Sequence, residues 1–208
     1  GKAALHQHAL PYDNNLTIDW IYSPATEKNE KILVFTTGEH GVECYVGAAM
    51  MHKFVEEYMP KFDSRTTGIL LVHAINPWGM KHHRRGNKDN IDLNRTFMLD
   101  PQFDSAFNIE YEKLDKFLNP KGKLQSNFLS NIAYLFGLAY HVSKVGMRDF
   151  RFALLLGQYR NPQGLYYGGK EMPEETRTLM DLYKMALRDY DQVLHLDMHT
   201  GYGPRYQM

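Results

Sequence analysis

The chain of 208 residues is 43% hydrophobic and 23% charged, which is ordinary for a globular protein with a full-sized core. Its 24 basic and 24 acidic residues balance, so no overall field attracts it to nucleic acid or to an anionic membrane. No apolar run approaches the length of a membrane span. We therefore expect one domain over residues 1–208, with neither nucleic acid nor membrane as a partner. The oligomeric state stays open.

Cys44 is the only cysteine, so the chain cannot form an internal disulfide. This favours a reducing compartment, and we expect the cytoplasm. Gly1 stands where a native chain carries Met, which suggests that the native N-terminus is absent. Secretion is therefore kept as an alternative.

The first regular elements alternate strand, helix and strand. Residues 31–37 are a short apolar, β-branched run that predicts a buried strand ending at Gly38. Apolar residues at helical spacing over 42–59 predict a helix that stops at Pro60, and residues 68–75 predict a second strand. This order is typical of a parallel crossover unit in an α/β fold.

The rest of the chain predicts a loop, several helices and a last strand. The polar segment 78–92 predicts a long loop, and loops of that length are usually functional or disordered. Helical patterns follow over 105–118, 127–145, 147–156 and 173–190, and residues 192–198 predict the final strand.

The string His40-Gly41-Val42-Glu43 follows the first strand and contains candidate metal ligands. A spacing of three places His40 and Glu43 on one face of a helical turn, so both can reach one ion. In open α/β sheets, ligands collect beyond the carboxyl ends of the strands. Alone the pattern is common, and Glu43 could merely favour a helix N-terminus. With His199 these residues would complete the three-ligand set of a catalytic zinc, which keeps its fourth position for water.

His199 lies at the end of the last predicted strand. Asp197, two residues earlier, shares its face of the strand, and an acidic neighbour commonly orients a ligand imidazole. The plainer alternative is a satisfied, partly buried histidine. A helical zinc pair of His195 and His199 is weaker, because Leu196 stands where the helical metalloprotease motif has its glutamate.

The string Asp92–Arg95 (DLNR) is the most specific of the three. The guanidinium of Arg95 can grip a carboxylate with two hydrogen bonds, and Asn94 adds a donor and an acceptor. A surface Asp–Arg pair with Asn94 as a helix cap is the alternative. Arg84 and Arg85, in the preceding loop, favour the anion-binding interpretation.

Taken in order, these strings resemble the zinc carboxypeptidase superfamily, which includes succinylglutamate desuccinylase and aspartoacylase, and within it a bacterial branch. The matching strings are GEHGVE at 38–43, NPWG at 76–79, RRGNKDNIDLNRTF at 84–97, GQY at 157–159, YGG at 167–169 and DMHTG at 197–201. The resemblance runs from about residue 30 to the end. It implies a three-layer α/β/α sandwich with a mixed, mostly parallel sheet.

The resemblance also implies one bound zinc ion and a role for each matching residue. His40, Glu43 and His199 look like the metal ligands. Asp92 looks like the carboxylate that hydrogen-bonds the first ligand histidine.

Four further residues look like substrate-binding groups. Asn94 and Arg95 look like the clamp on a terminal carboxylate, and Arg84 or Arg85 like the guanidinium that polarises the scissile carbonyl. The implied activity is zinc-dependent cleavage of an amide bond next to a carboxylate-bearing group, as in a metallocarboxypeptidase acting on a peptide. Deacylation of an N-acyl amino acid, and zinc or ligand binding without catalysis, are the alternatives.

One departure from the family concerns the general base. In the superfamily it is a glutamate well downstream of the third ligand, on a later strand. This sequence has no acid after Asp197 and stops at Met208. We therefore expect a C-terminal truncation, with the base lying beyond Met208, and completion of the sheet by a partner segment is the alternative.

Overall fold

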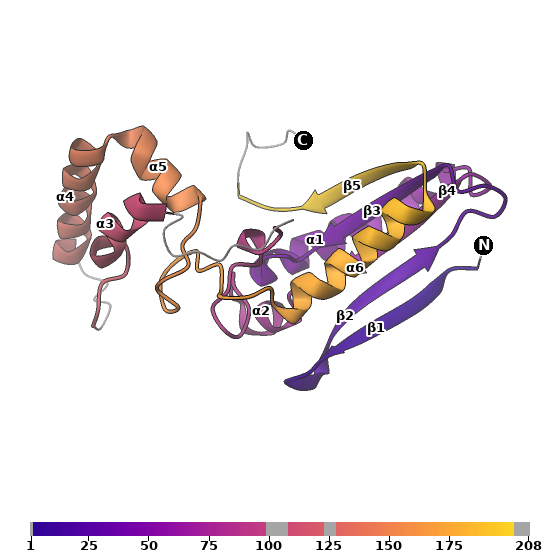
Figure 1. Ribbon diagram of the computed structural model, residues 1–208, viewed down its shortest axis with the longest axis horizontal. Helices are drawn as coiled ribbons and strands as arrows, with labels where there is room; N and C mark the ends of the chain where they lie inside the picture. Colours follow the sequence, from indigo (N-terminus) through magenta and orange to yellow (C-terminus); the bar gives the residue numbers. More distant parts are fainter. Residues whose placement is uncertain (1, 99–107, 123–127, 202–208) are drawn as a thin grey trace. The chain divides into compact units, whose positions relative to one another are not determined.

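The computed structural model describes residues 2–98, 108–122 and 128–201, which belong to two compact units (Figure 1). Unit 1 comprises residues 1–88 and 172–208, and unit 2 comprises residues 89–171. Each unit is described by itself. The expectation of one domain did not anticipate that the inserted segment 89–171 packs upon itself.

Unit 1 is built on a mixed five-stranded sheet with the order β1-β2-β4-β3-β5. Its strands are β1 (Ala4–Leu10), β2 (Asp13–Ser23), β3 (Lys31–Thr37), β4 (Thr67–His73) and β5 (Gln192–Met198). The neighbours of β3 are both parallel to it, whereas β2 is antiparallel to β1 and to β4. The predicted parallel crossover from β3 to β4 is therefore confirmed.

Helices cover both faces of this sheet (Figure 1). On one face, Leu33 and Phe35 of β3 pack against Phe54 of α1 (Cys44–Glu57). On the other face lies α6 (Glu174–Asp189), whose Tyr183 hydroxyl is 3.0 Å from Nε2 of His195 on β5. β3 is buried on both faces, as its unbroken apolar run predicts. The predicted α/β class and α/β/α layering are confirmed.

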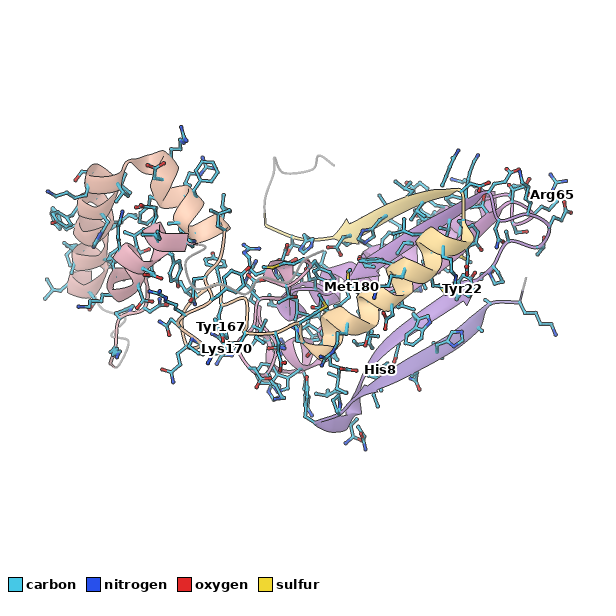
Figure 2. All side chains as sticks on the ribbon, viewed as in Figure 1. His8, Tyr22, Arg65, Tyr167, Lys170 and Met180 are labelled. Carbon is cyan, nitrogen blue, oxygen red and sulfur yellow. The ribbon has the colours of Figure 1, made fainter. Side chains whose placement is uncertain are left out.

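The β1–β2 hairpin contacts α6 and Tyr190, the residue that follows this helix, through polar side chains (Figure 2). Nε2 of His8 lies 2.9 Å from Oε1 of Glu174, at the first residue of α6. The hydroxyl of Tyr22 lies 3.3 Å from that of Tyr190. Polar contacts thus hold the edge of the sheet at both ends of the helix.

The described part of unit 2 contains the helices α3 (Ile109–Leu118), α4 (Phe128–Val145) and α5 (Met147–Leu155), and the short 3₁₀ turn η3 (Leu93–Arg95). Their common core is formed by Tyr111, Leu114, Phe150 and Ala153. Among the described residues, no helix combines the length and the apolar character needed to cross a bilayer. Residues 105–107 and 127, predicted as helical, lie outside the described residues.

The segment predicted as a loop over 78–92 begins with a short helix, α2 (Pro77–His82). Pro77 occupies the first helical position, where its missing N–H costs nothing. The Asn76 side chain caps the helix by accepting a hydrogen bond of 2.8 Å from the Gly79 N–H. These two residues outweigh the polar, glycine-containing sequence that favoured a loop. Two further 3₁₀ turns, η1 (Gly41–Glu43) and η2 (Met59–Lys61), flank α1.

Candidate metal centre

Gly38 directs the chain out of β3 toward the metal residues. It has a φ of +77°, and a Cβ placed there would lie 2.2 Å from Sγ of Cys44. Only glycine meets both conditions without strain. The turn η1 follows, with the Glu43 N–H donating to the His40 carbonyl at 2.9 Å. This turn places both side chains beyond the carboxyl end of β3.

A second contact fixes the same turn against α2 and the residues after it. The N–H of Val42 donates to the Arg84 carbonyl at 3.0 Å, and that of Gly41 to the Arg85 carbonyl at 3.3 Å. A Cβ on Gly41 would lie 2.1 Å from the carbonyl carbon of Gly79. The turn that carries the predicted ligands is therefore held by backbone on both sides.

The structure brings the three predicted metal ligands together. Nδ1 of His40 lies 3.2 Å from Nδ1 of His199. The Glu43 carboxylate bridges them, with Oε1 at 3.2 Å from His40 Nδ1 and Oε2 at 3.1 Å from His199 Nδ1. Oε2 also accepts the Thr200 N–H at 3.0 Å. Residues 159 positions apart in the chain thus share one small volume.

These separations fit a zinc ion. Zinc binds imidazole nitrogen at about 2.0–2.1 Å in a tetrahedron, so neighbouring ligand atoms lie roughly 3.3 Å apart. The two imidazole nitrogens are 3.2 Å apart, and each lies 3.1–3.2 Å from one of the two Glu43 oxygens. The donor set of two imidazoles and one carboxylate is also one that catalytic zinc commonly takes.

Two further acids hold the opposite edge of the His199 ring. Its Nε2 lies 2.5 Å from Oδ2 of Asp197 and 3.0 Å from Oε2 of Glu39. Asp197 is itself fixed, because its Oδ1 accepts a hydrogen bond of 2.7 Å from Thr36 Oγ1 on β3. With Nε2 held by acids, Nδ1 is directed toward His40 and Glu43.

Glu39 is the residue that sequence reasoning missed. It is buried, and a ligating atom of Glu39 lies within 4.8 Å of those of His40 and His199, so these three could also hold a metal ion. Glu43 lies nearer to Nδ1 of both histidines, whereas Glu39 contacts the Nε2 edge of His199. The available signal was a charged residue within the GEHGVE string, directly after a buried strand.

His195 does not join this cluster. It lies within β5, and its Nε2 contacts Thr36 Oγ1 at 2.8 Å and the Tyr183 hydroxyl at 3.0 Å. Since β5 is a strand, the alternative of a helical His195–His199 pair is wrong.

Arg84 and Arg85 have exposed side chains on a loop whose backbone touches the metal turn. The Arg85 carbonyl also accepts a hydrogen bond from Asn76 Nδ2 at 3.2 Å. Further along, the buried side chain of Asn87 donates to the buried Glu175 carboxylate of α6 at 3.4 Å. Both guanidinium groups therefore extend from a loop that is held by hydrogen bonds. The geometry does not show which of Arg84 and Arg85 would contact a substrate carbonyl.

The predicted clamp lies in unit 2. Asp92 caps η3, with Oδ1 accepting the Asn94 N–H at 3.2 Å, and its own N–H donates to the Tyr167 carbonyl at 2.7 Å. The Tyr159 hydroxyl donates to the Arg95 carbonyl at 2.9 Å. The DLNR, GQY and YGG strings of the sequence thus contact one another within this unit. The proximity of Asp92, Asn94 and Arg95 to the metal ligands stays a prediction.

Comparison with known proteins gives a family. A family model described as "Protein of unknown function (DUF2817)" matches residues 1–208. The chain belongs to this family. Among curated proteins, none matches the chain.

Two solved structures are similar to this DUF2817 chain. One is an aspartoacylase family protein (mlr6093) from Mesorhizobium loti MAFF303099, with 23% identity and a TM-score of 0.36 over 46% of this chain and 30% of that one. The other, from Shewanella amazonensis SB2B, is described as belonging to the succinylglutamate desuccinylase / aspartoacylase family. It has 18% identity and a TM-score of 0.46 over 97% of this chain and 47% of that one. The DUF2817 chain therefore spans less than half the length of either structure.

The electrostatics of the cluster favour positive charge at its centre. Hydrogen bonds to Asp197, Glu39 and Glu43 raise the pKa of His199 to about 12. Burial acts to raise the pKa of Glu43, but hydrogen bonds from His199, His40 and the Thr200 N–H together lower it. For Glu39, burial raises the pKa by more than the hydrogen bond to His199 lowers it, so its pKa is raised overall. Carboxylates at both edges of the His199 ring thus favour positive charge at this position.

Arg95 of this DUF2817 chain is half-buried and presents an unused donor. Within the described residues, its buried Nε has no hydrogen-bond partner. Its guanidinium lies 5.8 Å from the centre of the Tyr166 ring. Gly157, with a φ of +73°, passes so close that a Cβ there would lie 2.6 Å from Arg95 Cδ. The stem of the Arg95 side chain is therefore closely packed against Gly157.

Proposed function

We propose that the chain carries the metal centre of a zinc-dependent hydrolase that cleaves an amide bond next to a carboxylate-bearing group, as metallocarboxypeptidases do. The observation that carries this proposal is the convergence of His40 Nδ1, His199 Nδ1 and the Glu43 carboxylate within 3.2 Å. A zinc ion bound there would lower the pKa of its bound water to about 7 and polarise a substrate carbonyl.

The residues of the chain have separate tasks in this proposal. Asp197 and Glu39 hold the Nε2 edge of His199, which keeps Nδ1 directed at the metal. Arg84 or Arg85 stabilises the negative charge that develops on the carbonyl oxygen. Among the described residues, none is assigned the role of proton acceptor.

The substrate is bound through its carboxylate. Arg95 and Asn94 would form a two-pronged contact with that group, which determines the bond that is cut. Peptides with a free C-terminus and N-acyl amino acids both carry a carboxylate beside an amide, so both belong in an assay panel. A zinc- or ligand-binding domain without turnover is the competing function.

The metal assignment is tested by replacing His199 with Ala and measuring zinc content and affinity against a chromophoric chelator. Loss of one of three protein ligands should reduce zinc affinity by at least about 100-fold. His195→Ala is the matched control, because this histidine lies in β5, shortly before His199, and outside the cluster, and it should retain one zinc per chain. Stoichiometric, tight zinc in His199→Ala would reject the assignment.

Turnover separates the two functions. The zinc-loaded protein, in its longest natural form, should hydrolyse at least one member of the carboxylate-bearing amide panel. Zinc binding by the wild type with no turnover on the panel would favour the non-catalytic function.

A further inference from the structure

Asn76, the first residue of the NPWG string, is a polar residue outside the set of candidate metal ligands. It stands between β4 and α2, and its side chain is fully buried. Burying an amide costs free energy unless its hydrogen-bonding groups find partners. The partners of Asn76 therefore indicate what this residue does.

Asn76 holds the chain on either side of His40. Its backbone N–H donates to the Gly38 carbonyl at 2.9 Å. Its side-chain Nδ2 donates to the Arg85 carbonyl at 3.2 Å, and the same carbonyl accepts the N–H of Gly41 at 3.3 Å. The proposed ligand His40 thus lies between two backbone positions that Asn76 fixes, one directly and one through Arg85.

The other end of the same amide holds the helix turn against which Gly41 packs. Oδ1 of Asn76 accepts the Gly79 N–H at 2.8 Å and so fixes the first turn of α2. Gly41 lies directly against this turn, because a Cβ on Gly41 would be 2.1 Å from the carbonyl carbon of Gly79. A Cβ on Gly79 would in turn lie 2.6 Å from Asn76 Nδ2. Loss of the amide would therefore remove support from Gly41 on two sides.

The two contacts require the two different ends of an amide. The Gly79 N–H can only donate and the Arg85 carbonyl can only accept, which fixes the orientation of the Asn76 side chain. Aspartate would supply the acceptor without the donor, and alanine would supply neither. These two substitutions therefore separate the contact with α2 from the contact with Arg85.

We propose that Asn76 is a positioning residue for the metal turn, η1 (Gly41–Glu43). It holds Gly41, and through this residue His40 and Glu43, in the arrangement that binds zinc. This role rests on the proposed metal centre, but it requires neither turnover nor a contact between Asn76 and the metal. Loss of a hydrogen-bonding partner that supports metal ligands typically lowers metal affinity by about 10- to 100-fold.

Asn108 of unit 2 provides a matched control. It is also buried, and its Oδ1 caps α3 by accepting the Tyr111 N–H at 3.0 Å. Its Nδ2 donates to the carbonyls of Ala153 and Gly157 at 2.7 and 2.6 Å. Removal of either asparagine thus deletes a helix cap and a hydrogen bond to backbone carbonyl oxygen. The residues that Asn108 contacts in this way do not belong to the metal turn.

The test compares Asn76→Ala with Asn108→Ala. Both variants should unfold at a lower urea concentration than the wild type, and circular dichroism verifies that each is folded. Zinc affinity, measured by chelator competition, should fall about 10- to 100-fold in Asn76→Ala with one site per chain retained. It should be unchanged in Asn108→Ala. With Co²⁺ as the probe, visible absorption reports the ligand geometry, and the bands should change only in Asn76→Ala.

Asn76→Asp tests the bond to Arg85 separately. It retains an acceptor for the Gly79 N–H but loses the donor to the Arg85 carbonyl. A carboxylate would by itself attract a cation, so weaker zinc binding in this variant would point to the lost hydrogen bond. We expect a zinc affinity between those of the wild type and Asn76→Ala. If Asn76→Ala does not fold, Asn76→Asp and Asn108→Asp form the deciding pair.

The outcomes separate a positioning role from a purely structural one. Wild-type zinc affinity in folded Asn76→Ala, or an equal loss in Asn108→Ala, would overturn the proposal. Wild-type affinity in Asn76→Asp would overturn the link through the Arg85 carbonyl. His199→Ala, measured alongside, identifies a failure of the metal centre itself, because that variant would then keep tight zinc. Weak zinc binding by His199→Ala together with wild-type affinity in Asn76→Ala would reject only the positioning role.

Discussion

At the scale of single residues, the candidate site depends on how His199 is oriented. Nδ1 of its ring lies beside His40 and Glu43, the other two proposed metal ligands, and Nε2 lies beside Asp197 and Glu39, so the two nitrogens differ in their surroundings. Asp197 makes the shortest of these contacts and is anchored to Thr36. An acid of this kind fixes the orientation of a ligand imidazole and raises its basicity.

Asp197→Asn should therefore weaken zinc binding by about 10- to 100-fold while leaving one site per chain. The amide retains the shape but loses the charge that supports the imidazole. Affinity is measured by chelator competition, with Asp181→Asn as control because Asp181 is exposed and pairs only with Lys184 among the described contacts. Unchanged affinity in Asp197→Asn would show that the contact does not position the ligand.

Gly41 is a second residue on which the geometry of the candidate site depends, because the turn has no room for a Cβ atom there. A methyl group there would meet the backbone of Gly79 at 2.1 Å, and backbone cannot move aside as a flexible side chain can. Gly41→Ala should cost about 1–3 kcal/mol of unfolding free energy and should reduce zinc affinity through displacement of the turn. Urea unfolding measures the first effect, and Val42→Ala, at an exposed neighbour in the same turn, should show neither.

At the scale of elements, the end of β4 carries a half-buried histidine, His73, whose ionisation opposes folding. Nδ1 of His73, at the end of β4, contacts Thr37 Oγ1 at 2.6 Å. Burial lowers the pKa of His73, and the charge of Asp19 opposes this only in part. A histidine whose pKa is lower in the folded state contributes its full stability above the unfolded value of about 6.5. That contribution is lost as the pH falls below this value.

The melting temperature should accordingly decrease between pH 7 and pH 5, and His73→Gln should reduce the decrease. The glutamine retains a polar group for Thr37 but cannot take up the proton. His52→Gln provides the comparison, because His52 is an exposed residue of α1. If both variants lose as much stability as the wild type on acidification, His73 is not a source of the acid sensitivity.

At the scale of the whole molecule, the elements around the site could be predicted because their sequences obey simple rules. β3 and β5 were predicted with the bounds that they have, and the helix after Pro173 begins one residue beyond it. A buried parallel strand is a short apolar run, and acids in a first turn mark a helix start. His40, Glu43 and His199 follow such strands, so it could be predicted from the sequence that they lie close together.

Other features were not predicted. One is the β1–β2 hairpin: the polar residues His6, Gln7 and His8 dilute the alternation expected of β1, although the apolar residues at 16, 18, 20 and 22 of β2 do alternate. Glu39 is held by a contact to a residue 160 positions away, which no local pattern encodes. The compactness of residues 89–171 likewise depends on packing between α3, α4 and α5.

The most direct test of the account is an anomalous diffraction experiment at the zinc edge on crystals of the zinc-loaded protein. We expect one strong peak between Nδ1 of His40, Nδ1 of His199 and the carboxylate of Glu43, with each ligand atom at about 2.0–2.1 Å. A peak elsewhere on the chain, or a peak whose carboxylate ligand is Glu39 with Glu43 turned away, would contradict the proposed centre.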